Sequence, residues 1–196
     1  MGHYFINDEN LVSNIQEFSV SIQNCLFRFK TDNGVFSKRE LDFGSKLLIE
    51  TVLKENIQGE VLDFGCGYGV IGIIISKLTN CPVDMIDLNK RALHLANLNS
   101  VANKCLKTNV FYSDGFSLIK KKYDVIISNP PIRIGKVKLY NIFRDAKNFL
   151  KENGIIYLVI RKEQGAKSFM KDFSKLYKIE VLNKSKGFYI ISLKCC

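Results

Sequence analysis

The sequence predicts an α/β fold: an open, seven-stranded and mostly parallel β-sheet with one antiparallel strand, flanked by helices and preceded by a short N-terminal β-hairpin. From residue 60 onward, short apolar runs alternate with stretches of helical periodicity, a pattern typical of βα units. A glycine-rich turn joins the first of these strands to its helix. The last two apolar runs are separated by NKSKG, which is too short for a crossover helix, so they predict a terminal hairpin and one antiparallel strand.

The individual elements follow from local patterns. Alternating apolar residues over 18–22 and 25–30 predict the N-terminal hairpin, and apolar residues at helical spacing predict a helix over about 38–54. Strands of the sheet are expected at 60–64, 83–86, 108–112, 124–128, 155–160, 178–182 and 188–193. Helices are expected between them at 70–79, 90–102, 137–150 and 164–176.

Length and composition predict one ordinary globular domain over residues 1–196, because a single core covers roughly 100 to 200 residues. Within it we expect a hairpin extension over 1–36 and a ligand-binding catalytic core over 37–196. The cysteines show no CxxC pairing, so neither a zinc site nor a disulfide framework is indicated. No apolar stretch reaches the roughly 18 to 20 residues that span a bilayer, and the polar N-terminus is unlike a secretory signal. We therefore expect a soluble, cytoplasmic protein without a metal.

The charge is strongly positive. The 29 Lys and Arg against 19 Asp and Glu give a net charge of +10, which suits a polyanionic partner such as RNA, DNA or an anionic membrane. Residues 151–196 contain 10 basic and 4 acidic side chains and supply much of this excess. A general lysine bias with solvated side chains would explain the same balance.

A glycine-rich turn stands where the first sheet strand ends, with Gly65, Gly67 and Gly69 at alternate positions. Glycines there permit a tight turn and let a ligand approach the backbone at a helix N-terminus. The spacing departs from the dinucleotide fingerprint GxGxxG, because Val70 stands where its third glycine would be. Asp63, two residues before the first glycine, would repel a diphosphate and suits a cationic ligand. S-adenosylmethionine (SAM) carries both an ammonium and a sulfonium, so Asp63 is expected to hold its methionine end.

Two further acids end the next strands. Asp87 can accept both ribose hydroxyls of such a ligand, and Asp114 can accept a hydrogen bond from the adenine amine. Any one of these acids could equally be the N-cap of the next helix. Three of them at the carboxyl ends of successive strands favour ligand binding, since open α/β sheets bind ligands at that edge. Their neighbours Cys66, Leu88 and Gly115 are expected to contact the same cofactor.

The fourth strand ends at Asn129, Pro130, Pro131 and Ile132, which we predict to be catalytic. The prolines stiffen the turn, so the Asn129 side chain and the Pro130 carbonyl are held at a fixed spacing. Two such acceptors can grip both N–H bonds of an aromatic amine and aim its lone pair at a methyl group. A rigid turn without chemistry is the alternative.

The sequence resembles a known family, the class I SAM-dependent methyltransferases with a Rossmann-like sheet, and within them the small-subunit ribosomal RNA guanine-N2 methyltransferase C group. The likeness covers nearly the whole chain. It includes residues 31–37 (TDNGVFS), 41–48 (LDFGSKLL), 63–69 (DFGCGYG), 129–133 (NPPIR) and 186–189 (KGFY). The resemblance implies methylation of the guanine 2-amino group in 16S-type rRNA, with Asn129 and Pro130 as amine acceptors, Asn129 also beside the cofactor, and Phe36 and Ser37 over it.

The sequence departs from this family at two points. Related enzymes often have Tyr or Phe where Ile132 stands, so stacking on the target base would have to come from elsewhere, for example from Phe36 or Tyr189. Some members carry two methyltransferase-like halves, whereas this chain has one. RNA or the small ribosomal subunit is then expected to bind the hairpin, the basic C-terminal quarter and the side chains of Arg133, Lys136 and Lys138, unless a partner contributes.

Other functions remain open at this point. Asn-Pro-Pro turns also serve methylation of adenine N6 and of protein glutamine amides, although the basic charge favours RNA. A non-catalytic RNA-binding scaffold could retain the fold, but the intact glycine turn and Asn129 argue against it. A NAD-dependent dehydrogenase fits worst, because the third fingerprint glycine is missing and Asp63 is charged.

Overall fold

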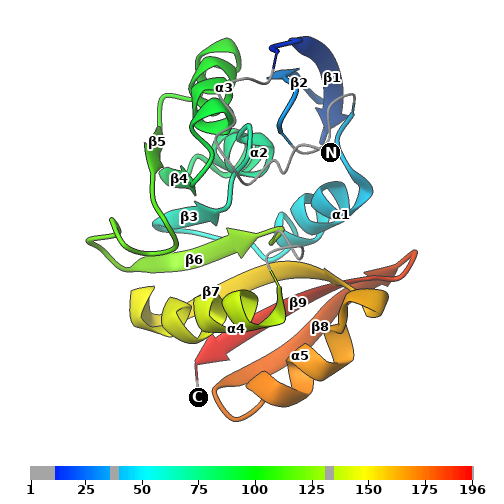
Figure 1. Cartoon of the computed structure of the whole chain (residues 1–196), viewed down its shortest axis with the longest axis vertical. Coiled ribbons are helices and arrows are strands. Elements are labelled where there is room, and N and C mark those ends of the chain that lie inside the picture. The colour runs from blue at the N-terminus through cyan, green and yellow to red at the C-terminus, as the bar shows by residue number, and fades with distance from the viewer. Residues whose placement is uncertain (1–11, 36–39, 131–134, 196) are drawn as a thin grey trace.

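The centre of the molecule is a seven-stranded sheet with the strand order β5-β4-β3-β6-β7-β9-β8, as the computed structural model shows (Figure 1). The structure describes residues 12–35, 40–130 and 135–195. All neighbouring strands are parallel except β9, which is antiparallel to both β7 and β8. This confirms the predicted sheet. Its strands are β3 (Val61–Phe64), β4 (Val83–Asp87), β5 (Thr108–Tyr112), β6 (Tyr123–Ser128), β7 (Leu150–Arg161), β8 (Tyr177–Ser185) and β9 (Phe188–Cys195).

Helices cover both faces of the sheet. Successive strand residues point to opposite faces, so the fully buried Val61 and Leu62 belong to two different cores. Burial on both faces explains why the central strands read as continuous apolar runs. Across the described ranges no helix is both long and apolar enough to cross a membrane. The Val61 face packs against α1 (Phe43–Val52), α2 (Val70–Thr79) and α3 (Lys90–Ala102), and the Leu62 face against α4 (Lys136–Asp145), α5 (Ala166–Phe173) and the 3-10 helix η2 (Ala146–Phe149).

The N-terminal hairpin, β1 (Gln16–Ile22) and β2 (Cys25–Thr31), packs against α3 (Figure 1). Asn99 of α3 donates to the Lys30 carbonyl oxygen at 2.9 Å and accepts from the Lys30 amide at 2.7 Å. One helical turn later, Asn103 makes the same pair of bonds with the Arg28 backbone, at 2.8 and 3.0 Å. Two asparagine side chains therefore satisfy the outer backbone groups of β2, as a neighbouring strand would.

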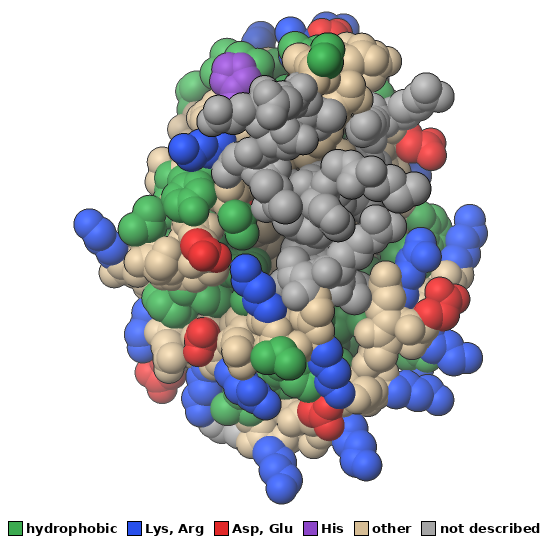
Figure 2. Space-filling view, viewed as in Figure 1, with side chains coloured by type: hydrophobic (Ala, Val, Ile, Leu, Met, Phe, Trp, Pro, Cys, Tyr) green, Lys and Arg blue, Asp and Glu red, His purple; other side chains and the backbone are tan. Residues whose placement is uncertain are grey.

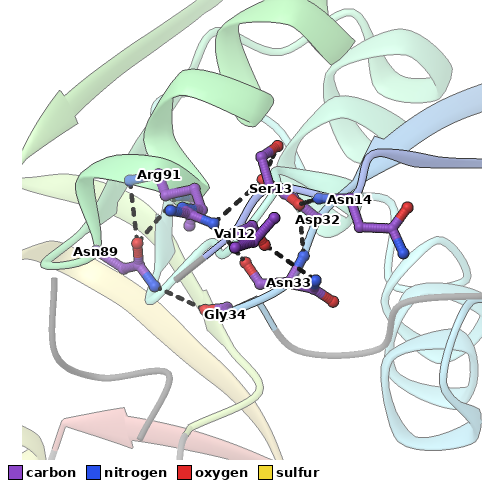
Figure 3. A network of polar contacts seen from close by, with 9 residues as sticks. Val12, Ser13, Asn14, Asp32, Asn33, Gly34, Asn89 and Arg91 are labelled. Carbon is purple, nitrogen blue, oxygen red and sulfur yellow. Dashed lines mark hydrogen bonds and ion pairs between the residues drawn. The ribbon is translucent and has the colours of Figure 1, made fainter. Parts of the chain in front are cut away.

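A polar network ties the segment after β2 to the start of α3 (Figure 3). The Arg91 guanidinium lies 3.4 Å from an Asp32 carboxylate oxygen and 3.3 Å from the Asn33 carbonyl oxygen. The Asn89 side chain caps α3 and also donates to the Gly34 carbonyl oxygen at 3.0 Å. The hairpin is thus connected to the loop that directly follows Asp87.

Several predicted boundaries differ from the structure. The helix predicted over 38–54 begins at Phe43, because Asp42 is extended and caps it by accepting from the Ser45 amide. The helix predicted over 137–150 ends as α4 at Asp145 and continues as η2. β7 starts earlier than predicted, and Asn153 adopts a positive φ of 64° within it. The helix predicted over 164–176 is shorter and follows the 3-10 helix η3 (Lys162–Gln164).

Candidate functional site

A cavity of about 430 Å³ opens at the carboxyl ends of the parallel strands. Its wall contains the segments that directly follow β3, β4, β5 and β6, and it also reaches α1, α4 and the first residue of β9. The volume falls in the range of small-molecule sites, and this edge is the usual ligand site of open α/β sheets. Among the described residues, no cluster of His, Cys, Asp or Glu could hold a metal ion.

The glycine turn forms the floor of the cavity after β3. Gly67 has a φ of 56°, and a Cβ atom there would meet nothing within 4 Å, so its backbone stays open to a ligand. Gly69 has a φ of 88°, and a Cβ atom there would lie 3.1 Å from the Ala96 Cβ, so a larger residue would press on α3. Gly69 itself does not line the cavity but precedes the first residue of α2. The turn thus directs the N-terminus of α2 toward the cavity side of the sheet.

Asp87 ends β4 in the cavity wall. One carboxylate oxygen accepts from the Gly67 amide at 2.9 Å and the other from the Asn89 amide at 2.8 Å. Burial raises the pKa of this carboxyl, and the backbone hydrogen bonds oppose that rise. Leu88 supplies a third backbone hydrogen bond, so the carboxylate keeps part of its acceptor capacity for a ligand hydroxyl. Asp114, after β5, also lines the cavity and is exposed; its carboxylate has no hydrogen-bond partner among the described residues.

Asp63 lies behind the glycine turn and does not line the cavity. Its side chain is fully buried, and one oxygen accepts from the Gly72 amide at 2.8 Å. The other oxygen has no hydrogen-bond partner within the described chain. Burial raises the pKa of Asp63 to about 7, the Gly72 amide opposes the rise, and the negative charge of Asp87 adds to it. Burial also raises the pKa of the neighbouring Cys66 thiol, which lines the cavity.

Asn129 follows β6 and lines the same cavity. Its Nδ2 donates to the Ser45 Oγ at 2.9 Å and lies 3.5 Å from an Asp42 carboxylate oxygen. A carboxylate can only accept, so the amide NH2 must face α1 and the amide oxygen must point the other way. That oxygen accepts no hydrogen bond from any described residue. The buried Pro130 follows in the cavity wall.

The structure brings together most of the predicted site. The predicted residues in the cavity wall are Gly65, Cys66, Gly67, Asp87, Leu88, Asp114, Gly115, Asn129, Pro130 and Lys138. Lys136 lies outside the wall, with its Nζ 3.5 Å from an Asp172 oxygen and over the Tyr140 ring. Tyr189 packs against the core on the α4–α5 side of the sheet. The predicted residues Phe36, Ser37, Pro131, Ile132 and Arg133 lie outside the described residues.

Sequence reasoning missed one whole wall of the cavity, formed by Asp42, Phe43, Ser45, Arg161, Gln164 and Phe188. Segment 41–48 enters the sequence prediction only through the family resemblance, although Asp42, three residues before Ser45, has the spacing of a helix N-cap. Phe188 and Tyr189 are adjacent in β9 and point to opposite faces of the sheet. Which of the two rings faces the cavity therefore depends on the strand register, which the sequence does not give.

These features fit the predicted cofactor. SAM carries vicinal hydroxyls that Asp87 can accept from and an adenine amine that Asp114 can accept from. Its two cationic groups suit the negative charge that these acids give to the cavity wall. The unpartnered Asp63 oxygen lies just behind the turn, where a cationic ligand would favour its charged form.

The comparison with protein families decides the assignment: residues 26–192 match the model of the methyltransferase small domain. The chain belongs to the methyltransferase small domain family. One relative aligns over almost its full length: the uncharacterized protein YbxB of Bacillus subtilis is 39% identical over 98% of both chains.

Two other similar proteins are longer than this chain. The ribosomal RNA small subunit methyltransferase C of Psychromonas ingrahamii is 34% identical over 91% of this chain and 51% of its own length. The T. thermophilus 16S rRNA N2 guanine methyltransferase RsmC, solved with AdoMet and guanosine, superimposes with a TM-score of 0.81 at 21% identity, over 93% of this chain and 51% of that one. The chain thus spans about half the length of these two relatives.

Proposed function

We propose that this protein transfers a methyl group from SAM to the exocyclic N2 amine of a guanine in small-subunit ribosomal RNA. SAM is the methyl donor of methyltransferases of this fold. The observation that carries the proposal is the fixed orientation of the Asn129 amide, whose NH2 is held by Ser45 and whose oxygen is left as an acceptor in the cavity wall. The proposal takes residues 1–196 as one domain, with the hairpin at 1–36 and the core at 37–196.

The proposed mechanism needs acceptors and positioning rather than a strong base. When bound, SAM supplies an electrophilic methyl group on a sulfonium. Asn129 Oδ1 and the Pro130 carbonyl accept the two amine hydrogens and turn the nitrogen lone pair toward that methyl. Transfer of the methyl to nitrogen would release a neutral thioether and would make an amine proton acidic only at that stage, so the proton could leave to water. Asp87 and Asp114 would hold the ribose and adenine end, and Gly67 leaves room for the ligand at the backbone.

Three observations support RNA over a protein glutamine. The net charge is +10, and on the face shown in Figure 2 Lys and Arg side chains outnumber Asp and Glu over the lower half, where α4, α5 and β8 lie. The cavity wall beyond Asn129 contains Lys138 and Arg161. The similar proteins include methyltransferases of small-subunit rRNA.

The test is methyl transfer from isotopically labelled SAM to small-subunit rRNA, free and as assembled subunits, taken from cells that lack this protein. Mass spectrometry of nuclease digests should identify N2-methylguanine at one position. The Asn129→Ala variant should keep its SAM affinity and lose about two orders of magnitude in turnover, the scale of one positioned polar contact. Label found in N6-methyladenine or in a protein glutamine would contradict the proposed guanine substrate and identify another one. SAM binding without transfer to any of these would favour a scaffold.

A further inference from the structure

The strand order arranges the cavity residues in a line along one edge of the sheet. In spatial order, the residues at the carboxyl ends of adjacent strands are Asp114 after β5, Asp87 in β4, Gly65 after β3, Asn129 after β6 and Arg161 in β7. One end of the line is therefore acidic and the other is basic. Asn129, the proposed amine acceptor, lies between the two ends.

Arg161 at the basic end is held in place without using its hydrogen-bonding capacity. Its guanidinium carbon lies 4.4 Å from the centroid of the Phe188 ring, the residue that faces it across the antiparallel β7–β9 pair. The side chain is exposed, lines the cavity, and makes no hydrogen bond or ion pair with any described residue. A stacked guanidinium keeps its N–H donors available in the plane of the group.

The ring under Arg161 is itself anchored. Phe188 packs against Phe43 of α1 at 5.4 Å between centroids, and Lys186 Nζ lies 4.7 Å from the centroid of Phe43. A Cβ atom on Gly44 would lie 2.8 Å from a Phe188 ring carbon, so this close approach depends on a glycine in α1. The Arg161 side chain therefore rests on a packed platform, which lowers the entropy lost when it binds a ligand.

A second cation faces the same space from α4. Lys138 lines the cavity, is exposed, and has no hydrogen-bond or ion-pair partner in the described part of the chain. The wall there also contains Gln164, whose side chain likewise has no described partner. This end of the cavity thus offers two positive charges and a neutral amide. The Asp42 carboxylate lies in the same wall, but it caps α1 and faces the Asn129 amide, and it forms no ion pair with Arg161 or Lys138.

From this arrangement we infer that Arg161, together with Lys138, binds a backbone phosphate of a nucleic acid next to the base whose amine meets Asn129. The inference rests on the proposed function and adds to it the part of the substrate that is recognised. The planar guanidinium matches a phosphate in a bidentate manner, and the lysine adds a point charge. The acidic end accepts the cationic cofactor, and the basic end accepts the anionic backbone. The separation of charge along the sheet edge thus places the cofactor on the β5–β4 side of Asn129 and the RNA backbone on the β7 side.

Several features favour a phosphodiester over the carboxylate of an acidic protein. The amine acceptor next to the site is suited to a base that has been turned out of its stack, and such a base remains attached to a phosphate on each side. The excess of positive charge over the whole chain suits a polyanion with closely spaced charges. The substrate is then a polynucleotide, and a free nucleoside would lack the group that Arg161 holds.

The test compares Arg161→Gln with wild type in binding a fluorescein-labelled single-stranded RNA of roughly ten nucleotides, followed by anisotropy at several salt concentrations. The matched control is Arg144→Gln, because Arg144 is exposed on α4, contacts only Asn141 among the described residues, and lies outside the cavity. Calorimetric SAM affinity and the melting temperature check that each variant is folded. Because the contact is to the backbone, RNAs with and without guanine should respond alike.

We expect Arg161→Gln to weaken RNA binding by about 10- to 100-fold and to reduce the slope of log affinity against log salt by about 0.7, with SAM affinity unchanged. Arg161→Lys should recover part of the loss, and Arg144→Gln should behave as wild type. An Arg161→Gln variant with wild-type RNA affinity and slope would overturn the inference, as would the absence of RNA binding by wild type. It would also be overturned if polyglutamate of equal charge bound as tightly and with the same dependence on Arg161. Failure of the proposed function alone looks different: RNA binding still depends on Arg161, but no guanine is methylated.

Discussion

At the scale of single residues, the orientation of the Asn129 amide depends on two side chains at the start of α1. Ser45 is 3% exposed and accepts the Asn129 NH2, while Asp42 both caps α1 and lies at the far side of that NH2. These two residues decide which end of the amide faces the cavity. They are positioning residues for the proposed amine acceptor.

Ser45→Ala should therefore lower kcat about tenfold, because the amide loses the contact that orients it, while SAM affinity changes little. Ser45→Thr retains the hydroxyl and should recover part of the rate. The control is Ser76→Ala, which removes a buried hydroxyl bonded to the Cys81 carbonyl oxygen in another part of the structure. The measurement is single-turnover methyl transfer with calorimetry of SAM binding. Equal rates for Ser45→Ala and Ser76→Ala would contradict the positioning role.

Asp63 gives the protein a pH-dependent stability. Its pKa is about 7 in the folded chain, against 3.8 for an exposed aspartate, because burial disfavours the charge. Between these values the folded state holds a proton that the unfolded chain has lost, so stability falls as pH rises from about 4 to 7. Asp87, whose pKa is also raised by burial, acts in the same direction.

We expect the free energy of unfolding in the absence of ligand, measured with urea, to be higher at pH 5 than at pH 8. Each pKa unit corresponds to about 1.4 kcal/mol. Asp63→Asn keeps an acceptor for the Gly72 amide and cannot ionise, so it should reduce this difference. An Asp63→Asn profile parallel to that of wild type would assign the pH dependence to other groups.

The residues predicted from sequence were those in contiguous, chemically distinctive segments. The glycine turn, the acids that end the strands and Asn129 stand next to strand ends, so strand prediction alone places them at one edge. Arg161 and Phe188 could not be found in this way, because their contact comes from the antiparallel register of β7 and β9, which the sequence does not specify. Asp63 can be found from its position two residues before the glycine turn. Whether its carboxylate faces the ligand or the α2 backbone depends on three-dimensional packing, which the sequence does not give.

At the scale of elements, hydrophobic periodicity predicts the order and type of the helices and strands. It does not predict the residues at which several of them begin and end. The apolar pattern over 38–54 continues through residues that are not helical, since capping by Asp42 ends the helix earlier than apolar spacing suggests. The early start of β7 depends on Asn153, which has a positive φ, and on Gly154, where a Cβ atom would lie 3.0 Å from the carbonyl oxygen of Tyr123 at the start of β6. Such boundaries are set by side-chain hydrogen bonds and close contacts rather than by hydrophobic pattern.

The attachment of the hairpin to α3 leads to a stability prediction. Asn99 is fully buried and makes three hydrogen bonds, two with the Lys30 backbone and one with the Tyr68 carbonyl oxygen in the glycine turn. Asn99→Ala removes all three and should lower the free energy of unfolding by about 2 to 4 kcal/mol. Asn97→Ala is the control, because Asn97 is exposed on the same helix and bonds only within it. Similar denaturation midpoints for the two variants would show that the hairpin is held by other contacts.

At the scale of the whole molecule, the positive charge should govern RNA binding and leave cofactor binding almost unaffected. The affinity for RNA should fall steeply and linearly on a logarithmic salt scale, because bound phosphates release counterions. SAM binding should show only a weak salt dependence, because the proposed site holds it by hydrogen bonds inside the cavity. Anisotropy and calorimetry in parallel between low and physiological salt would measure both. A flat RNA response would point to a substrate other than a polyanion.

The two asparagines that pair with β2 also affect how copies of the protein behave in solution. A strand at the margin of a sheet can recruit a strand from another molecule, and natural proteins protect such margins. Here Asn99 and Asn103 already occupy the N–H and C=O groups that a foreign strand would need. Removing both amides would leave these backbone groups without their partners, so we expect a double Asn99→Ala, Asn103→Ala variant to self-associate more readily than wild type at high concentration.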